Sequence, residues 1–433
     1  MTNVVDNKIN ANPTKEFFIE MLTRDIALDR AILDLIDNSV DASRQENKPD
    51  SWIRLNFDTE KFEIYDNCGG MDKNLAQTYA FRFGRPSDSP KTPNSVGQFG
   101  VGMKRTLFKL GKKFVVESKN KGKAFRISIN VDEWKSREEK DWTFDIEDIN
   151  DTNLKDGETR ITVTDLYDEI SSSLSLETFE NSLSSEVSYA HFKSINKGLK
   201  IFINERSVSE YNLTLLHSDV IQPYKKTFDV GDVHISITAG ISNRDIKKGG
   251  WYIVCNGRLV ENSEQTNITG WGVDKIPQYH ADYAFFRGIV EFDCTNSSKL
   301  PWTTTKTGVD KDNPIYTAAL YHMKNVMREV ISFLKSRAKE DNQFKESLLD
   351  QKPLNDAIFN AIKEKKTVTP SNALFSEQFI APDPVAPLSE PKETSIQYKV
   401  LTKDINKVKE SLGITSNKEV GEKTFNYYME YEC

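Results

Sequence analysis

The sequence predicts an α/β (α+β) protein of several domains, and three observations support this fold class. Its 433 residues exceed the usual size of a single domain. The N-terminal part combines an amphipathic helical pattern at 31–42 with alternating segments typical of strands. From 198 to 294 the alternating segments predominate, and a helical pattern returns at 314–349. We therefore expect two sheet-containing domains followed by a helical C-terminal extension.

The composition excludes a membrane protein. Hydrophobic residues make up 37% of the chain, and the mean hydropathy is −0.56. No segment approaches the roughly 18 apolar residues of a membrane span, and the polar N-terminus lacks the apolar core of a signal peptide.

The four cysteines lack metal-binding spacing, so we expect a cytoplasmic protein with reduced thiols. The net charge of −7 argues against general nucleic-acid binding but is compatible with a local basic groove.

Residues 31–42, AILDLIDNSVDA, form the most informative segment of the chain. On a helix, Asp34, Asn38 and Asp41 share one face, and four aliphatic residues form the apolar side. An amide oxygen in line with carboxylates can hold a divalent metal and orient a water molecule. A solvated polar face on a surface helix would give the same pattern, so the neighbouring motifs decide between the two interpretations.

Three further motifs follow in order. A hairpin pattern at 53–66 leads into Asp66-Asn67-Cys68-Gly69-Gly70-Met71. The segment SVGQFGVGMK at 95–104 contains a G-x-x-G-x-G pattern, and DGETRITV at 156–163 places Thr159 at the start of a strand. Glycines at this density let backbone N–H groups approach phosphates closely. The ordered set is far more specific than any single glycine-rich loop.

This ordered set resembles the GHKL group of ATPases, which includes type II DNA topoisomerase B subunits, MutL, a cytosolic heat-shock chaperone, sensor histidine kinases and MORC proteins. The resemblance implies a Bergerat fold, an α/β sandwich that holds ATP and Mg²⁺ under a mobile lid. It implies that Asp34 is the catalytic base, Asn38 the Mg²⁺ ligand and Asp66 the acceptor for the adenine amino group. The other nucleotide-binding positions that it implies are Gly70 and Met71 near the base, Gly97, Gly100, Val101 and Gly102 in the phosphate loop, Lys104 behind that loop, and Thr159 beside the adenine.

The catalytic position departs from the group, in which the base is usually glutamate. The side chain of Asp34 is shorter by one carbon–carbon bond, about 1.5 Å. Misplacing a catalytic group by about 1 Å can cost roughly 100-fold in rate. We therefore expect an ATPase with low turnover.

A second domain is expected to begin near residue 190. Four alternating segments are typical of strands, at 198–208, 234–241, 250–260 and 285–294, and Asn256-Gly257 is a favourable hairpin turn. The following loop carries Lys306, which by itself would be interpreted as a solvated surface cation. The order of these elements resembles the ribosomal S5-like transducer domain of GHKL proteins, most of all MORC proteins and their prokaryotic relatives. The resemblance implies that Lys306 reaches back to the γ-phosphate of ATP and takes part in catalysis.

The C-terminal part predicts helices and a linker. Apolar residues recur at helical spacing after Pro314, and residues 367–392 are rich in proline and predict an extended, mobile linker. The tail predicts one or two helices, with room for a short strand, that serve in docking or dimer formation. The expected domains are 1–185 for the ATPase, 190–335 for the transducer with its trailing helix, 336–366 for a helical extension, 367–392 for the linker and 393–433 for the tail.

Two classes of function agree with these features. The first is an ATP-gated homodimeric clamp of MORC-like type that traps DNA, with residues 8–30 exchanged between protomers. The second is a chaperone-like or regulatory ATPase that acts on a protein client, and analogy alone suggests a prokaryotic defence system. No histidine precedes Asp34 in this sequence, so we do not expect the upstream phosphoacceptor helix of a sensor kinase. The acidic net charge favours a protein client, whereas the transducer resemblance favours DNA.

Overall fold

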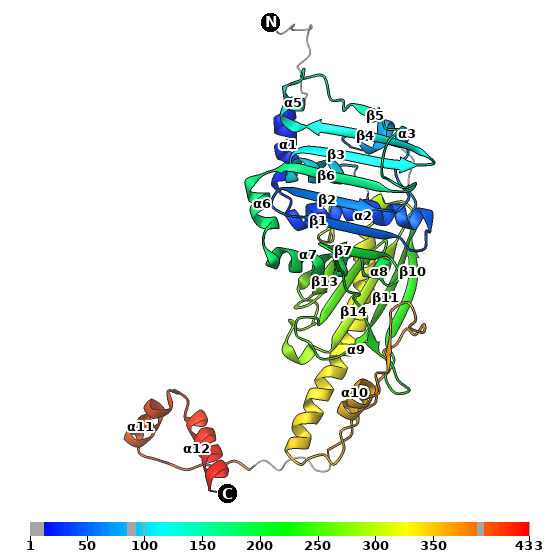
Figure 1. Ribbon diagram of the computed structural model, residues 1–433. Helices are drawn as coiled ribbons and strands as arrows, with labels where there is room; N and C mark the ends of the chain where they lie inside the picture. Colours follow the sequence, from blue (N-terminus) through cyan, green and yellow to red (C-terminus); the bar gives the residue numbers. More distant parts are fainter. Residues whose placement is uncertain (1–12, 85–91, 98–99, 388–393, 433) are drawn as a thin grey trace, which may run out of the picture.

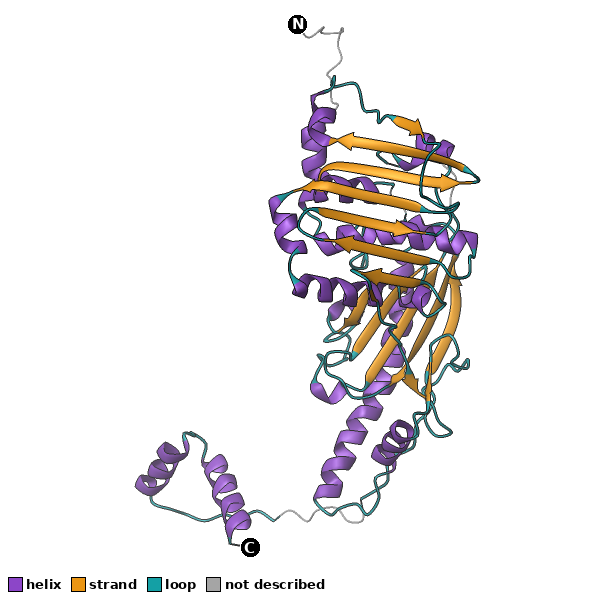
Figure 2. Cartoon of the chain, viewed as in Figure 1, coloured by secondary structure: helices purple, strands orange, loops and turns teal. Residues whose placement is uncertain are grey.

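The computed structural model describes residues 13–84, 92–97, 100–387 and 394–432. Its strands gather in two main sheets, one N-terminal and one central, and a long helix extends away from the central sheet (Figures 1 and 2). This arrangement confirms the predicted α/β (α+β) class. Among the described residues, no helix combines the length and apolar character needed to cross a membrane.

The first sheet has the spatial strand order β5-β4-β3-β6-β2-β1-β7-β8 within the described residues. The expected hairpin at 53–66 is confirmed, because β1 and β2 pair antiparallel with Phe57 opposite Phe62. Neighbours in this sheet are otherwise antiparallel except for β1 and β7, which are parallel. The strands are β1 (Trp52–Phe57), β2 (Lys61–Asp66), β3 (Gly111–Asn120), β4 (Lys123–Asn130), β5 (Ile146–Asp148), β6 (Thr159–Leu166), β7 (Lys200–Ile203) and β8 (Arg206–Ser207).

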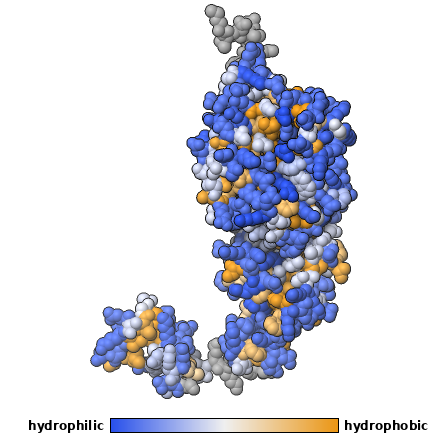
Figure 3. Space-filling view, viewed as in Figure 1, coloured by the Kyte–Doolittle hydropathy of each residue, from blue (hydrophilic) through white to orange (hydrophobic). Residues whose placement is uncertain are grey.

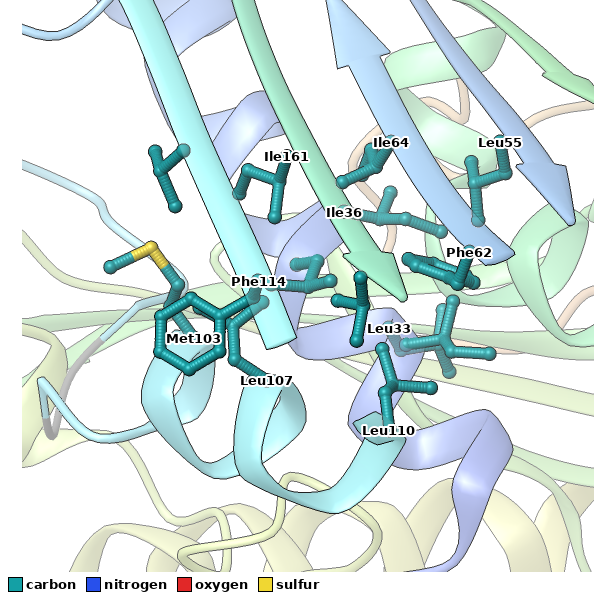
Figure 4. Close-up of a cluster of buried hydrophobic side chains, with 14 of the residues drawn as sticks. Leu33, Ile36, Leu55, Phe62, Ile64, Met103, Leu107, Leu110, Phe114 and Ile161 are labelled. Atoms are coloured by element: carbon teal, nitrogen blue, oxygen red, sulfur yellow. The ribbon is translucent and has the colours of Figure 1, made fainter. Parts of the chain in front are cut away.

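Helices α2 (Leu28–Glu46) and α4 (Gly102–Leu110) cover one face of the first sheet. The predicted helix at 31–42 is confirmed inside α2, whose apolar side chains face the strands. Figure 4 shows this core, in which aliphatic residues of both helices meet aromatic and aliphatic residues of four strands. Thr106 Oγ1 donates to the Ala31 carbonyl at 2.6 Å and ties the two helices together. The remaining helical elements of this region are α1 (Lys15–Arg24), α3 (Lys73–Leu75), η1 (Ala76–Ala80), α5 (Val131–Ser136), α6 (Asp168–Leu174), α7 (Glu177–Ala190) and α8 (Phe192–Ile195).

The second sheet has the order β10-β11-β14-β12-β13, and helix α9 (Pro314–Lys345) packs on β11 and β14. Asn256-Gly257 forms the expected tight turn between β12 and β13, with both residues at positive φ. Asn313 caps α9 through its side chain, and Pro314 occupies the first turn, as its fixed φ favours. The elements here are β10 (Tyr224–Val230), β11 (Val233–Ile241), β12 (Gly250–Cys255), β13 (Arg258–Glu264), β14 (Phe286–Asp293), η2 (Asn267–Thr269), η3 (Ala281–Tyr283) and η4 (Ser297–Lys299).

The domain boundary expected at residue 190 is wrong. Residues 198–208 do contain strands, but β7 pairs in parallel with β1 and therefore belongs to the first sheet. The register places Ile201 beside Ile53 and Ile203 beside Leu55, and all four side chains are buried in the first core. The chain leaves the first sheet only after β8. The expected bound between 335 and 336 lies inside helix α9, which continues to Lys345.

The first half of the proline-rich segment is not the mobile linker that we expected. Strand β15 (Thr367–Val368) pairs with β9 (Leu215–Leu216), and residues 376 and 380 pair with the backbone at 225 and 222. Lys225 Nζ donates to three carbonyl oxygens of the segment, those of Pro370 at 2.7 Å, Ala373 at 3.1 Å and Ser371 at 3.3 Å. These contacts hold residues 367–381 against the edge of the second sheet.

The tail contains two helices, α11 (Thr402–Leu412) and α12 (Asn417–Tyr431), which contact each other. The short strand considered for the tail is absent from its described residues. Figure 3 shows hydrophobic side chains gathered on this C-terminal part, where Val420 is the one buried apolar residue of α12. Helix α10 (Pro353–Lys363) lies between α9 and the proline-rich segment in the chain.

Candidate nucleotide site

The glycine-rich loop meets helix α2 at the polar stripe that the sequence singled out. Asp41 accepts hydrogen bonds from the backbone N–H groups of Val96 at 2.9 Å and Gly97 at 2.8 Å. Burial raises the pKa of Asp41 to about 6, although these two N–H groups act in the opposite direction. Residue 41 thus fixes the start of the loop over the helix.

Asn38 lies exposed on α2 beneath this loop, and its carboxamide makes no hydrogen bond to the part of the chain that the structure describes. A Cβ at Gly97 would lie 3.2 Å from Asn38 Oδ1, so the missing side chain leaves the amide oxygen accessible. A single protein oxygen beside a phosphate loop fits Mg²⁺, which keeps most of its waters and takes phosphate oxygens as further ligands. Asn38 is therefore a suitable magnesium ligand.

Asp66 lies at the end of β2 with its carboxylate buried. Ser39 Oγ donates to Oδ2 at 2.7 Å, and the Cys68 N–H donates to Oδ1 at 2.9 Å. Burial raises the pKa of Asp66 to about 6, while both hydrogen bonds lower it. Thr159 lies directly opposite on β6, so the two predicted adenine-binding residues are neighbours in the sheet.

The strand next to β6 adds a further hydroxyl group to this end of the site. Ser118 Oγ lies 2.8 Å from Thr159 Oγ1 and accepts a hydrogen bond from the Met71 N–H at 2.7 Å. Gly70 adopts φ +70°, and a Cβ there would lie 2.2 Å from the Lys119 carbonyl oxygen. The glycine is therefore required for the close approach of residues 69–71 to β3.

Asp34 is buried between two cations from different parts of the chain. Its Oδ2 contacts Arg105 Nη2 of helix α4, and its Oδ1 lies 3.0 Å from Lys306 Nζ. Gly102, the first residue of α4, packs on this carboxylate, since a Cβ there would lie 3.0 Å from Asp34 Cγ. The predicted catalytic base and the predicted transducer lysine are thus in direct contact.

Asp37 is the second partner of Lys306 and is completely buried. Its carboxylate lies 2.6 Å from Lys306 Nζ, 2.7 Å from Arg258 Nε and 3.3 Å from His191 Nε2. Burial alone would raise the pKa of Asp37, but the charges of Arg258 and Lys306 hold it well below its usual range. Burial lowers the pKa of His191 to about 3, so the imidazole is neutral at physiological pH. Burial opposes the charge on Lys306, but the two aspartates raise its pKa, so the ammonium stays charged.

The remaining predicted residues lie at the start of α4. Val101 precedes the helix, and Gly100 adopts φ +66°, which favours glycine. Lys104 is buried and donates to the Ala80 carbonyl at 2.7 Å, and burial lowers its pKa to about 7. Lys104 therefore points toward η1 in this conformation, and its expected phosphate contact stays a prediction.

Sequence reasoning missed six residues of this site, namely Asp37, Ser39, Arg105, Ser118, His191 and Arg258. Asp37 carried a signal, since it lies one helical turn after Asp34, but we assigned it no role. Arg258 carried none, because it lies 221 positions along the chain from the aspartate that it contacts.

Comparison with known proteins agrees with this geometry. Residues 26–159 match a family model described as histidine kinase-, DNA gyrase B-, and HSP90-like ATPase. No curated protein matches the chain. The matched region is less than a third of the 433 residues; it contains Asp34, Asn38, Asp66, the glycine-rich loop and Thr159, whereas Lys306 lies outside it. The match and the site together support an ATP-binding domain of the GHKL ATPase type at residues 26–159.

Proposed function

We propose that the protein binds ATP with Mg²⁺ and hydrolyses it slowly as an ATP-gated homodimeric clamp on DNA. In this proposal Asp66 accepts the adenine amino group, with the Thr159 and Ser118 hydroxyls beside it. Asn38 holds Mg²⁺, which neutralises charge on the phosphates when it is bound. The backbone at Gly97 and at residues 100–102 surrounds the phosphates, as the glycines there permit.

The observation that carries the proposal is the position of Lys306. This lysine belongs to the loop after β14, yet its ammonium is buried in the first domain between Asp34 and Asp37. A cation in that place can bind the terminal phosphate of ATP and then lose that ligand after hydrolysis. Because the lysine is part of the second domain, its change of partner couples nucleotide state to the relative position of the domains.

Slow turnover follows from the surroundings of Asp34. A general base must have a free carboxylate oxygen within reach of the attacking water. Here Lys306 and Arg105 occupy one oxygen each, and the side chain is already short by about 1.5 Å compared with glutamate. Hydrolysis therefore requires these cations to move first.

The clamp part of the proposal rests on the MORC-like order of domains and on helix α1. Phe17 and Met21 of α1 are 58% and 53% exposed, which is unusual for large apolar side chains on adjacent turns of one helix. A second protomer would cover them when the N-terminal segments exchange. The S5-like assignment of the second sheet belongs to the same proposal.

Two measurements test the proposed function. Calorimetry should detect Mg²⁺-dependent ATP binding, and light scattering should detect dimers with a non-hydrolysable ATP analogue but not with ADP. Lys306→Ala should keep nucleotide affinity but lose the dimer, whereas Lys299→Ala, at an exposed lysine paired with Asp232, should behave like the parent.

An electrophoretic shift with long duplex DNA then identifies the client. A shift that requires the analogue supports the DNA clamp. Dimers that form with the analogue but never retain DNA would instead favour a protein client, and identical scattering in all nucleotide states would contradict the clamp.

A further inference from the structure

We infer that Arg105 is a second binding residue for the terminal phosphate, and that it exchanges the Asp34 carboxylate for this phosphate when ATP binds. This inference rests on the proposed ATP site and adds a residue that the glycine-rich motif does not include. Two oxygens of a phosphate can accept hydrogen bonds from one guanidinium, as the two oxygens of a carboxylate do. One arginine can therefore bind either group in turn.

The first support is the position of the arginine. Arg105 lies in the first turn of α4, which begins at Gly102 directly after the phosphate loop, and its backbone N–H donates to the Val101 carbonyl at 2.8 Å. Its guanidinium meets the same carboxylate as Lys306, one cation on each oxygen of Asp34. A group that draws Lys306 away from Asp34 therefore arrives within reach of Arg105.

The second support is an unused donor. The Arg105 side chain is only 12% exposed, and its Nε is buried without a hydrogen-bond acceptor among the residues that the structure describes. A buried N–H group without an acceptor is costly, particularly in a charged side chain. The single contact with Asp34 Oδ2 leaves the Nε donor of Arg105 without an acceptor. A second anionic ligand with several oxygens would supply one.

The third support is the charge of the contact network around Asp34 and Asp37. Three cations, Arg105, Arg258 and Lys306, face these two carboxylates, and His191 is neutral. The network thus carries one positive charge in excess, inside a region of low dielectric where that excess attracts an anion strongly. Arg258 is fixed on Asp37 and fully buried, so Arg105 and Lys306 are the two cations next to the proposed phosphate position.

The competing explanation is that Arg105 only neutralises Asp34. A double-mutant cycle separates the two explanations, because Asp34→Asn removes the need for a counter-ion but leaves the phosphate in place. The cycle compares the parent, Arg105→Met, Asp34→Asn and the double variant. The readout is equilibrium affinity for ADP and for a non-hydrolysable ATP analogue, measured with Mg²⁺ by calorimetry.

We expect Arg105→Met to weaken analogue binding by about 10- to 100-fold, as for the loss of a buried charged hydrogen bond, and to change ADP affinity by less than about threefold. The loss should be as large or larger in the Asp34→Asn background, where no carboxylate competes for the arginine. Arg105→Lys should restore part of it. Arg126→Met is the matched control, since Arg126 pairs with Glu117 on the sheet surface.

Several outcomes would overturn the inference. If the Arg105→Met effect disappears in the Asp34→Asn background, the arginine is only a counter-ion. If Arg105→Met weakens ADP and analogue equally, its effect is on the fold of the site, and unchanged analogue affinity would equally refute phosphate binding. Failure of the parent to bind any nucleotide would instead refute the proposed ATP site itself, and this inference with it.

Discussion

Replacement of Asp66 by asparagine should stabilise the nucleotide-free protein while it abolishes ATP binding. The Asp66 carboxylate is buried at the end of β2, and burial raises its pKa from 3.8 to about 6. The asparagine amide has the same shape but no charge, so it avoids the cost of burying an ionised carboxylate. Its oxygen can accept from the Cys68 N–H, and its NH₂ group can donate to Ser39 Oγ.

The magnitude follows from the difference in pKa between the folded and unfolded chain. Below about pH 4 the carboxyl is protonated in both states and has no effect on stability. Between about pH 4 and 6 the carboxyl ionises in the unfolded state but not in the folded state. The free energy of unfolding of the parent therefore falls by about 1.4 kcal/mol per pH unit. Above pH 6 the loss is complete at about 3 kcal/mol, and Asp66→Asn should gain about that amount at pH 8 but little at pH 4.

Thermal unfolding of both proteins from pH 4 to 8 measures this difference, and subtraction cancels Asp41, whose pKa is also raised to about 6. A gain of about 3 kcal/mol corresponds to about 6–12 °C for a domain of this size. Asp168→Asn, at an exposed carboxylate, is the matched control and should show no such profile.

Calorimetry of the parent should show ATP affinity that falls as Asp66 protonates below about pH 6, together with a preference for ATP over GTP of about 100-fold or more. Asp66→Asn should lose this binding. If the two proteins keep a constant difference in stability at every pH, the carboxylate is not penalised by burial, and the reasoning is refuted.

Three further predictions address the base, a glycine and the proline-rich segment. Asp34→Asn should bind ATP within a few-fold of the parent but lose hydrolysis in single-turnover assays, and turnover at the parent rate would exclude Asp34 as the base. Gly70→Ala should destabilise the protein by about 3 kcal/mol or more, because the new Cβ meets a backbone oxygen at 2.2 Å. Gly122→Ala, at φ +77° in open space, should cost only about 1 kcal/mol in the same thermal assay, and equal losses would contradict the contact. Lys225→Met should speed limited proteolysis within 367–381 by about 100-fold, since three hydrogen bonds of about 1 kcal/mol each are removed. Lys226→Met removes only a surface ion pair with Glu377 of the same segment and should leave the cleavage rate nearly unchanged. Equal cleavage of both variants would show that Lys225 does not hold the segment.

Local signals in the sequence were sufficient for most individual elements. The amphipathic pattern of α2, the alternation of β1 and β2, the Asn256-Gly257 turn and the helical pattern after Pro314 each depend on neighbouring residues, and all are confirmed. Such signals say which side chains are buried. They do not say which strand is the partner, and this is why β7 was assigned to the wrong sheet.

The missing parts of the site have the same cause. Asp37, Arg258 and His191 come from three distant segments, and each charged or polar residue taken alone is expected at the surface. Only the tertiary fold makes them partners, because a buried carboxylate needs cations that the helix itself does not supply. The proline-rich segment was misjudged similarly, since its composition is that of a linker and the lysine that holds it belongs to β10.

Helix α9 begins shortly after Lys306, and its 32 residues are continuous. At 1.5 Å per residue it is a rigid rod of about 48 Å. Glu340 near its far end accepts from the backbone N–H groups of Leu354 and Asn355, so α10 moves with it. A rotation of only about 10° at the phosphate end would displace the far end by about 8 Å, for a rod of this length. In the proposed clamp this helix would act as a lever arm, which converts an exchange of ion-pair partners into a displacement large enough for a partner to detect.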